Sequence, residues 1–255
     1  MSDAALVLRQ VRFEQRTFWR NPASAFFAFA FPVMFLLIFG SLNRGARIES
    51  MGNIPYNAYY VPALITFGVI GACMTNISMS VTIRRDSGVL KRLRGTPLPP
   101  WVFMAGLIGS SAVVSAILSG LLTAAGMLIY GIAAPRHPAM LLLVLVVGGM
   151  SFCALGLALS SLIPNAEAAP AVTNAVVLPL LFISGTFYPL DPSSVLSRIA
   201  DWFPMRHFAL ALLAAFDPQG NQPGLPAAHL WVLLVWGLVG VTIAVRRFQW
   251  EPWRS

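Results

Sequence analysis

The 255-residue sequence has few charged residues, a single lysine and two cysteines. Charged residues make up only 10% of the chain, whereas hydrophobic residues make up 57%. The charges gather in short clusters, and the uncharged stretches between them are too long for the core of a soluble domain. This shortage of charge argues against a soluble protein and indicates an integral membrane protein.

Motifs for common enzyme chemistry are also missing. The chain has no GxxxxGK[ST] loop, so it lacks the phosphate-binding loop of an ATPase. Its three histidines form no HExxH pattern and its cysteines lack metal-ligand spacing, so we expect no metal site. No GxSxG motif occurs, and serines in the apolar stretches have no nearby His and Asp. We therefore expect a chain that is not an enzyme and holds no cofactor.

The first three long apolar stretches contain no Asp, Glu, Lys, Arg or His. Ionisable residues inside the membrane are the usual mark of pumps driven by protons or sodium. The chain also shows no obvious inverted repeat, which many secondary transporters have. If this protein moves a substrate, we expect the energy to enter from outside the membrane.

Long apolar runs are what the sequence has in abundance. A membrane-spanning helix needs about 20 apolar residues, and six segments meet this requirement. We predict an all-α integral membrane fold with one six-span domain over residues 21–255, preceded by an amphipathic helix at 1–20. The six predicted spans are residues 22–43, 59–83, 102–130, 139–163, 168–190 and 227–245.

Residues 191–218, between the fifth and sixth spans, contain an apolar stretch that is too short to cross a membrane. Backbone at membrane depth must be buried in protein, so this region is predicted to form an outer re-entrant helical hairpin. An amphipathic pair of helices lying on the outer leaflet is the alternative. Residues that shape this region are Gly185, Pro189, Trp202 and Pro204.

Basic residues are distributed unevenly between the two sides that six spans create. Twelve of the seventeen lie at the termini and in the loop after the second span, and five lie on the other side. The positive-inside rule therefore places both termini in the cytoplasm of a multi-pass protein of the inner (plasma) membrane. The net charge of +8 comes from arginines at membrane boundaries, which favours contact with membrane lipid over nucleic-acid binding.

The loop after the second span, residues 84–100, reads RRDSGVLKRLRGTPLPP. It predicts a short two-sided helix, with Asp86 and Ser87 as candidate N-caps and the proline-rich end as its stop. Such a helix would suit a cytosolic partner, although a solvated basic loop is the alternative. The candidate contact residues are Gly88, Val89, Leu90, Lys91, Arg92, Leu93, Arg94, Thr96 and Pro97.

Residues 6–20 project as an amphipathic helix at 100° per residue. Val7, Val11 and Phe18 fall nearly opposite a basic face, so the helix should lie at the inner leaflet. It is either a plain membrane anchor or part of the partner-binding apparatus. The basic face consists of Arg9, Arg12, Arg16 and Arg20.

A few polar side chains and one methionine occur at positions of interest in the second and fifth spans. Polar groups avoid lipid by facing another helix or a cavity, and both outcomes stay open here. If they face a path, the apolar surroundings predict a hydrophobic or amphipathic substrate. The candidate path-lining residues are Thr75, Asn76, Met79, Thr173, Asn174 and Ser184.

Several strings resemble type-2 ABC exporter permeases, the membrane subunits of drug, polysaccharide and lipid exporters. SGVLKRLRGTPLPPWVF, residues 87–103, is similar to their coupling helix, and residues 164–190 are similar to their fifth span and its SGTFYPL exit. WFPMRHFALALL at 202–213 fits their outer hairpin, and RRFQWE at 246–251 fits their tail. The order and spacing of these strings most resemble the daunorubicin and multidrug-resistance branch.

The resemblance implies a homodimer of six-span subunits that carries two copies of a separate ABC ATPase subunit. ATP and Mg²⁺ would bind to that partner. Residues 88–94 would sit in a cleft of the ATPase, flanked by the amphipathic helix. In the family, an acidic residue often stands directly before the glycine of the coupling helix. In this chain Asp86 stands two positions before Gly88, which leaves open how an acid-dependent contact is made.

Two hypotheses follow. The first is an exporter permease that moves a drug-like compound, lipid or glycolipid out of the cytoplasm, with ATP hydrolysed by a separate subunit. The second is a non-transporting membrane protein, such as an assembly factor or a channel. The sequence leaves the substrate open.

Overall fold

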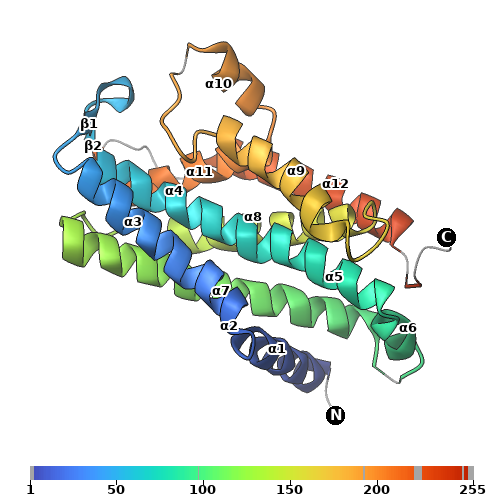
Figure 1. Cartoon of the computed structure of the whole chain (residues 1–255). Coiled ribbons are helices and arrows are strands. Elements are labelled where there is room, and N and C mark those ends of the chain that lie inside the picture. The colour runs from blue at the N-terminus through green and yellow to red at the C-terminus, as the bar shows by residue number, and fades with distance from the viewer. Residues whose placement is uncertain (1–2, 97, 192, 221–225, 249, 252–255) are drawn as a thin grey trace.

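The computed structural model describes residues 3–96, 98–191, 193–220, 226–248 and 250–251. The chain is mainly helical, and its long helices run side by side (Figure 1). One end of this bundle carries α1 (Asp3–Trp19) and α6 (Val89–Arg94), and we call it the α6 end. The opposite end carries two short strands and is called the β end.

Five helical segments are long and apolar enough to cross a membrane, and they match predicted spans one to four and six in order. The first consists of α2, η1 and α3, and the second of α4, η3 and α5, where η1 and η3 are single π-helical turns. Their bounds are Pro22–Ala25, Phe26–Ala30 and Phe31–Leu42 for the first span, Tyr56–Ile70, Gly71–Thr75 and Asn76–Asp86 for the second, and Pro100–Tyr130 (α7), Pro138–Ser160 (α8) and Ala227–Arg247 (α12) for the others.

The fifth predicted span is shorter in the structure than in the prediction. Helix α9 covers Ala169–Ile183, whose 15 residues extend for about 22 Å, less than the roughly 30 Å of a bilayer core. The chain then turns at Gly185, which has a φ of +82°. The predicted residues 184–190 are thus not helical, and the six-span count stays a prediction.

The β end contains elements that the sequence did not predict. Strands β1 (Arg47–Ile48) and β2 (Ile54–Pro55) pair antiparallel around a 3₁₀ turn, η2 (Glu49–Met51). Ile48 pairs with Ile54, and both side chains are buried in a small cluster of their own. This hairpin closes the loop between the first and second spans.

The predicted outer hairpin corresponds to α10 (Val195–Ala200) and α11 (Pro204–Phe216). Helix α11 packs against α4, α8 and α12, and Phe208 has no exposed surface. The ring of Phe208 meets that of Phe152 on α8 edge to face, with 5.3 Å between the ring centroids. Helix α11 is therefore part of the bundle, while its depth in a membrane stays a prediction.

Candidate functional site

Helix α6 projects from the bundle where the chain turns between the second and third spans. Gly88 makes this turn with a φ of +71°. This left-handed conformation is unfavourable for residues other than glycine, because their Cβ atom clashes with the backbone. Leu90 is fully buried against the main core, whereas Val89, Lys91 and Arg92 are exposed. One side of α6 is thus fixed to the bundle, and the other is open to a partner.

The predicted N-caps of α6 are wrong. Asp86 is the last residue of α5, and its carboxylate accepts a hydrogen bond from the backbone N–H of Ala166 at 3.0 Å. The Ser87 hydroxyl donates to the Arg84 carbonyl at 3.3 Å. Gly88 itself is the N-cap residue, and its left-handed conformation replaces the extended backbone that a side-chain cap uses.

The end of the predicted contact segment is only partly described. The Thr96 hydroxyl donates to the Leu93 carbonyl at 2.6 Å and accepts from the backbone N–H of Leu98 at 3.4 Å. Pro97 and the side chain of Arg94 lie outside the described residues. Their predicted roles therefore stay predictions, as do those of the other contact residues.

A buried ion pair joins α1 to the end of the second span. Arg84 donates from both terminal nitrogens to the Glu14 carboxylate, at 2.7 and 2.6 Å, and Gln10 donates to the same carboxylate at 2.9 Å. The Glu14 side chain is only 5% exposed and that of Arg84 18%. Two parallel hydrogen bonds fix the geometry of such a pair as well as its charge.

The next two residues join the second span to α8 and the loop after it. Arg85 is almost completely buried and donates to the carbonyls of Ser160 (2.9 Å), Ile163 and Pro164 (3.3 Å). The last carbonyls of a helix lack partners within it, and a cation there also suits the helix dipole. With Asp86 bound to Ala166, we call Arg84, Arg85 and Asp86 the clasp.

Helix α1 lies directly on α7. A Cβ atom at Gly106 would fall 2.1 Å from Cγ of Gln10, so only glycine permits this approach. The Gln15 side chain donates to the carbonyl and hydroxyl oxygens of Ser110 at 2.9 and 3.0 Å. The four predicted basic residues, Arg9, Arg12, Arg16 and Arg20, are all exposed.

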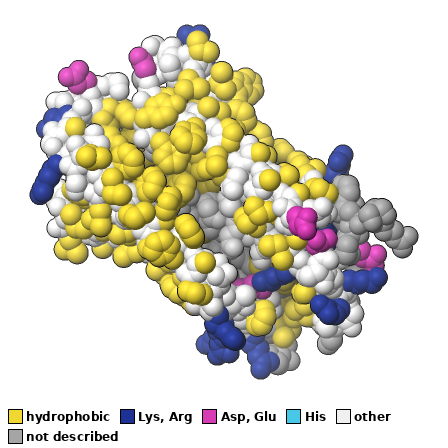
Figure 2. All heavy atoms as spheres, viewed as in Figure 1, with side chains coloured by type: hydrophobic (Ala, Val, Ile, Leu, Met, Phe, Trp, Pro, Cys, Tyr) yellow, Lys and Arg dark blue, Asp and Glu magenta, His cyan; other side chains and the backbone are white. Residues whose placement is uncertain are grey.

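A cavity of about 640 Å³ lies between α1, the first and second spans, and α7. Figure 2 shows a hollow near the centre of the molecular surface in that view. The Glu14–Arg84 pair lies at one end of the cavity, and Pro32 and Phe67 lie deeper in the bundle. The lining residues with polar uncharged side chains are Thr17, Asn21, Ser24, Thr75, Asn76, Ser80, Ser110 and Ser111.

The structure separates the candidate path residues into two groups. Thr75, Asn76 and Met79 line the cavity. Thr173 is buried, with its hydroxyl 3.1 Å from that of Ser78, and Asn174 is exposed on another face. The Ser184 hydroxyl is buried and donates to the Leu181 carbonyl at 2.7 Å. Their role in a path stays a prediction.

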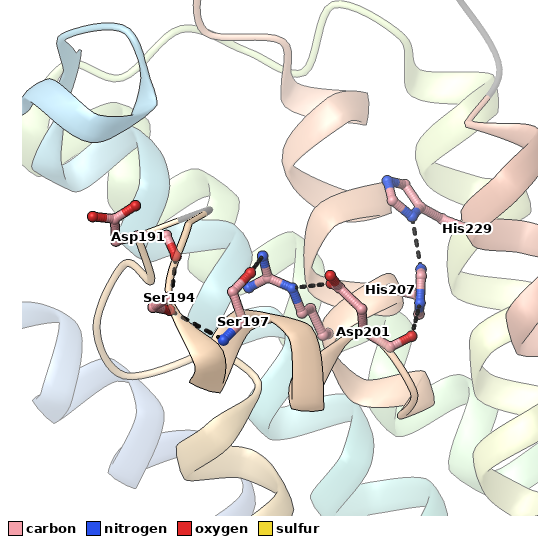
Figure 3. A network of polar contacts seen from close by, with 7 residues as sticks. Asp191, Ser194, Ser197, Asp201, His207 and His229 are labelled. Carbon is pink, nitrogen blue, oxygen red and sulfur yellow. Dashed lines mark hydrogen bonds and ion pairs between the residues drawn. The ribbon is translucent and has the colours of Figure 1, made fainter.

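A polar network holds the outer hairpin together at the β end (Figure 3). Arg206 donates to Asp201 at 2.6 Å and to the Ser197 hydroxyl at 2.8 Å. His207 and His229 lie with their Nδ1 atoms 2.8 Å apart, which joins α11 to α12. At the start of the network, the N–H and hydroxyl of Ser193 hold the pKa of Asp191 below its usual value.

The four residues predicted to shape the hairpin lie around this network. Gly185 accepts a hydrogen bond from the hydroxyl of the buried Tyr59. Pro189 lies in the turn after α9, and Pro204 is buried at the first position of α11. Trp202 is 79% exposed, and its carbonyl accepts from the Trp236 indole at 3.0 Å.

Sequence reasoning missed Glu14, although the sequence carries a signal for it. At 100° per residue, Glu14 falls within about 40° of Val7 and Phe18, on the apolar face of its helix. A lone carboxylate on such a face needs a partner. The contact between His207 and His229 had no comparable signal, because 22 residues separate them.

Comparisons with known proteins identify the family of the chain. Residues 5–216 match the family described as ABC-2 type transporter. The chain is 27% identical over 157 residues to the probable multidrug ABC transporter permease YbhR of Escherichia coli K12, covering 61% of this chain and 43% of that protein. It is also 27% identical over 157 residues to the inner membrane transport permease YadH of the same organism, covering 62% and 60%.

Nodulation protein J of Neorhizobium galegae is 23% identical over 195 residues, which cover 74% of this chain and 73% of that protein. The matches thus span less than two thirds of YbhR and YadH. The family match is broader, because it extends from α1 to the end of α11 and includes the clasp, α6 and the cavity. The chain therefore belongs to the ABC-2 type transporter family.

Proposed function

We propose that the chain is the membrane-spanning permease subunit of an ATP-driven exporter, and that the exposed side of α6 receives a separate ABC ATPase. The clasp is the observation that carries this proposal. It ties the base of α6 to α1 through Glu14, to the end of α8 through Ser160 and to the α8–α9 loop through Ala166. A push on α6 would therefore move several spans together.

The α6 end is the cytosolic end in this proposal, with both termini on the same side. Most basic residues lie there, in keeping with the positive-inside rule. ATP and Mg²⁺ would bind to the ATPase subunits. Since α1 lies at the same end of the bundle as α6 and carries four exposed arginines, it would flank the docking site.

The working assembly would contain two copies of this permease and two ATPase subunits. Helix α9 presents an exposed face with Asn174, Leu178 and Phe182, which would suit a second copy of the chain. The names of YbhR and YadH include the word permease, and that of YbhR also includes multidrug. We therefore propose a hydrophobic or amphipathic substrate that leaves the cytoplasm.

Co-purification tests this proposal with charge-matched variants. Lys91→Ser with Arg92→Ser removes two exposed positive charges from α6, and Arg246→Ser with Arg247→Ser removes two from the end of α12. The ABC ATPase encoded nearest to this gene should co-purify with the wild type and the α12 variant, and much less with the α6 variant. Equal recovery with both variants would refute docking at α6.

The alternative is a membrane assembly factor or a channel. Neither requires a nucleotide-hydrolysing partner. If no ABC ATPase co-purifies with the wild type in membranes, this alternative is favoured over the exporter.

A further inference from the structure

We infer that the cavity between α1, the first two spans and α7 binds one uncharged amphiphile with hydroxyl or amide groups. We also infer that the Glu14–Arg84 pair at its end connects occupancy of the cavity to the position of α6. The first inference concerns this chain alone. The second deepens the proposed function, since it rests on α6 as the docking element.

Asn76 is the strongest sign that the cavity has an occupant. It lies within the second span, and its side chain is exposed. Among the described residues, no side chain or backbone group makes a hydrogen bond with the Asn76 amide, the Thr75 hydroxyl or the Ser80 hydroxyl. An unbonded amide at membrane depth is unfavourable, because lipid tails offer no hydrogen bond. A ligand with polar groups of its own would supply the missing partners.

The dimensions of the cavity fit a single small amphiphile. Its volume of about 640 Å³ falls within the range of ligand-binding pockets. Its lining along the second span runs from Phe67 to Arg84, which corresponds to about 25 Å of helix. This length accommodates a polar headgroup and an extended chain.

Charge selects the class of ligand. Among the described residues, Glu14 and Arg84 are the charged ones that line the cavity, and they neutralise each other. An anionic or cationic headgroup would therefore lose its hydration without gaining an opposite charge. Neutral hydroxyl and amide groups can instead exchange hydrogen bonds with the polar side chains of the wall.

The apolar part of the ligand would contact the apolar side chains that line the cavity. Phe27 and Pro32 from the first span, Phe67 from the second and Val114 from α7 line the cavity. Because these residues lie away from the Glu14–Arg84 pair along their helices, a chain would point into the bundle and a headgroup toward the α6 end.

The Glu14–Arg84 pair connects the cavity to the clasp. Arg84 lines the cavity, and Gly88 begins the turn into α6 only four residues later. A ligand that separates α1 from the second span would therefore shift α6. Glu14 and Arg84 act here as positioning residues.

Photolabelling of the whole chain in phosphatidylcholine nanodiscs, without any ATPase, tests the site. The probes are a photoreactive monoacylglycerol, the fatty acid with the same chain and the alkylammonium with the same chain. The monoacylglycerol should label residues 17–32 and 67–84, about tenfold more efficiently than either charged probe. Equal labelling by the three probes, or labelling confined to α12, would overturn the site.

Matched variants examine the polar wall. Asn76→Leu and Thr75→Val should raise the half-saturating monoacylglycerol concentration roughly tenfold, the usual loss when a hydrogen-bonding partner is removed. Thr242→Val makes the same change as Thr75→Val on an exposed face of α12 and should have no effect. Unchanged saturation in both cavity variants would contradict the assignment. So would disulfide formation between Asn76→Cys residues of two chains, because a second copy would then fill the cavity.

Hydrogen exchange of residues 88–94 tests the connection to α6, again without ATPase. Monoacylglycerol should change the exchange rate of this segment in the wild type. At a monoacylglycerol concentration that saturates labelling of each protein, Glu14→Gln should lose the response, whereas an equal response would overturn the connection. Since no ATPase is present, failure here is distinguishable from failure of ATPase docking.

Discussion

Glu14 and Arg84 have two hydrogen bonds between them and little exposed surface, so each depends on the other. Removing one charge of a buried pair leaves the remaining charge without compensation, which costs more than removing both. The pair also connects α1 to the segment that leads into α6. Its contribution is therefore measurable both as stability and as coupling between elements.

We predict that Glu14→Gln and Arg84→Gln each lower the free energy of unfolding by about 2 kcal/mol. The double variant should lose less than the sum of the two, because neither charge is left alone. Thermal unfolding in nanodiscs measures all three. Arg92→Gln, at an exposed position of α6, should stay within about 0.5 kcal/mol of the wild type. Additive losses from the two single changes would argue against the ion pair.

The His207–His229 contact predicts a response to pH. The Nε2 atom of His207 is 2.8 Å from the Asp201 carbonyl and must donate to it, so its Nδ1 accepts from His229 when both rings are neutral. The pair of imidazoles tolerates one added proton. A second proton places the Nδ1–H of His207 against the Nδ1–H of His229. Arg206 adds positive charge nearby, and Asp201 opposes it.

Acid strong enough to place a second proton on the pair should therefore separate α11 from α12. Spin labels on the two helices measure this distance. His207→Phe and His229→Phe should each remove the pH response, since either leaves a single imidazole. The same response in all three proteins would show that other groups cause it.

Some of these residues were within reach of the sequence and others were not. Helical projection could have assigned Glu14 to a buried position, because it falls on the apolar face of α1. The partners of Arg85 are backbone carbonyls of α8 and the loop after it, and no pattern of side chains in the sequence predicts such partners. Thr75 and Thr173 look alike in sequence, yet only Thr75 lines the cavity, because the packing of α9 on α5 buries Thr173.

At the scale of elements, the direction of α6 depends on the turn at Gly88. This glycine has a φ of +71°, and Gly45 at the β end has a φ of +86°. A Cβ atom at either position would meet nothing within 4 Å, so backbone strain is the shared cost of substitution. The two glycines thus form a matched pair.

We expect Gly88→Ala and Gly45→Ala each to cost about 1 to 2 kcal/mol of stability. Only Gly88→Ala should also weaken co-purification of the ATPase, because it redirects α6. Thermal unfolding and co-purification are measured on the same samples. Equal ATPase recovery from both variants would show that the direction of α6 does not matter for docking.

The contact between α1 and α7 offers a second matched pair. Gly106 touches Gln10 of α1, whereas a Cβ atom at Gly120 of the same helix would meet nothing within 4 Å. Gly106→Ala should displace α1 and destabilise the protein, while Gly120→Ala should be neutral or stabilising by up to about 1 kcal/mol. Thermal unfolding decides this. Equal effects would contradict the close approach of the two helices.

Long apolar runs allowed the sequence to predict five of the spans closely, because about 20 apolar residues have few other solutions. The ends of the segments were harder to predict than the segments themselves. The sequence predicts a fifth span to Leu190, but α9 ends at Ile183, before the turn at Gly185. The β1–β2 hairpin was missed because its strands have only two residues each, too few for an alternating pattern.

At the scale of the whole molecule, the clasp and the outer hairpin lie at opposite ends of the bundle. The α6 end has the clasp, α1 and the charged end of the cavity, and the β end has the outer hairpin and its polar network. The spans connect the two ends as continuous helices, so a movement at α6 can reach the β end. This arrangement suits a permease whose energy comes from a separate subunit.

Site-specific crosslinking in membranes tests the central claim, docking of an ABC ATPase on α6, most directly. A photoreactive residue replaces Lys91 on α6 or Trp202 at the β end, both of which are exposed. We predict that the Lys91 position crosslinks to the ATPase subunit and that the Trp202 position does not. Absence of a crosslink from Lys91, or an equal yield from Trp202, would contradict it.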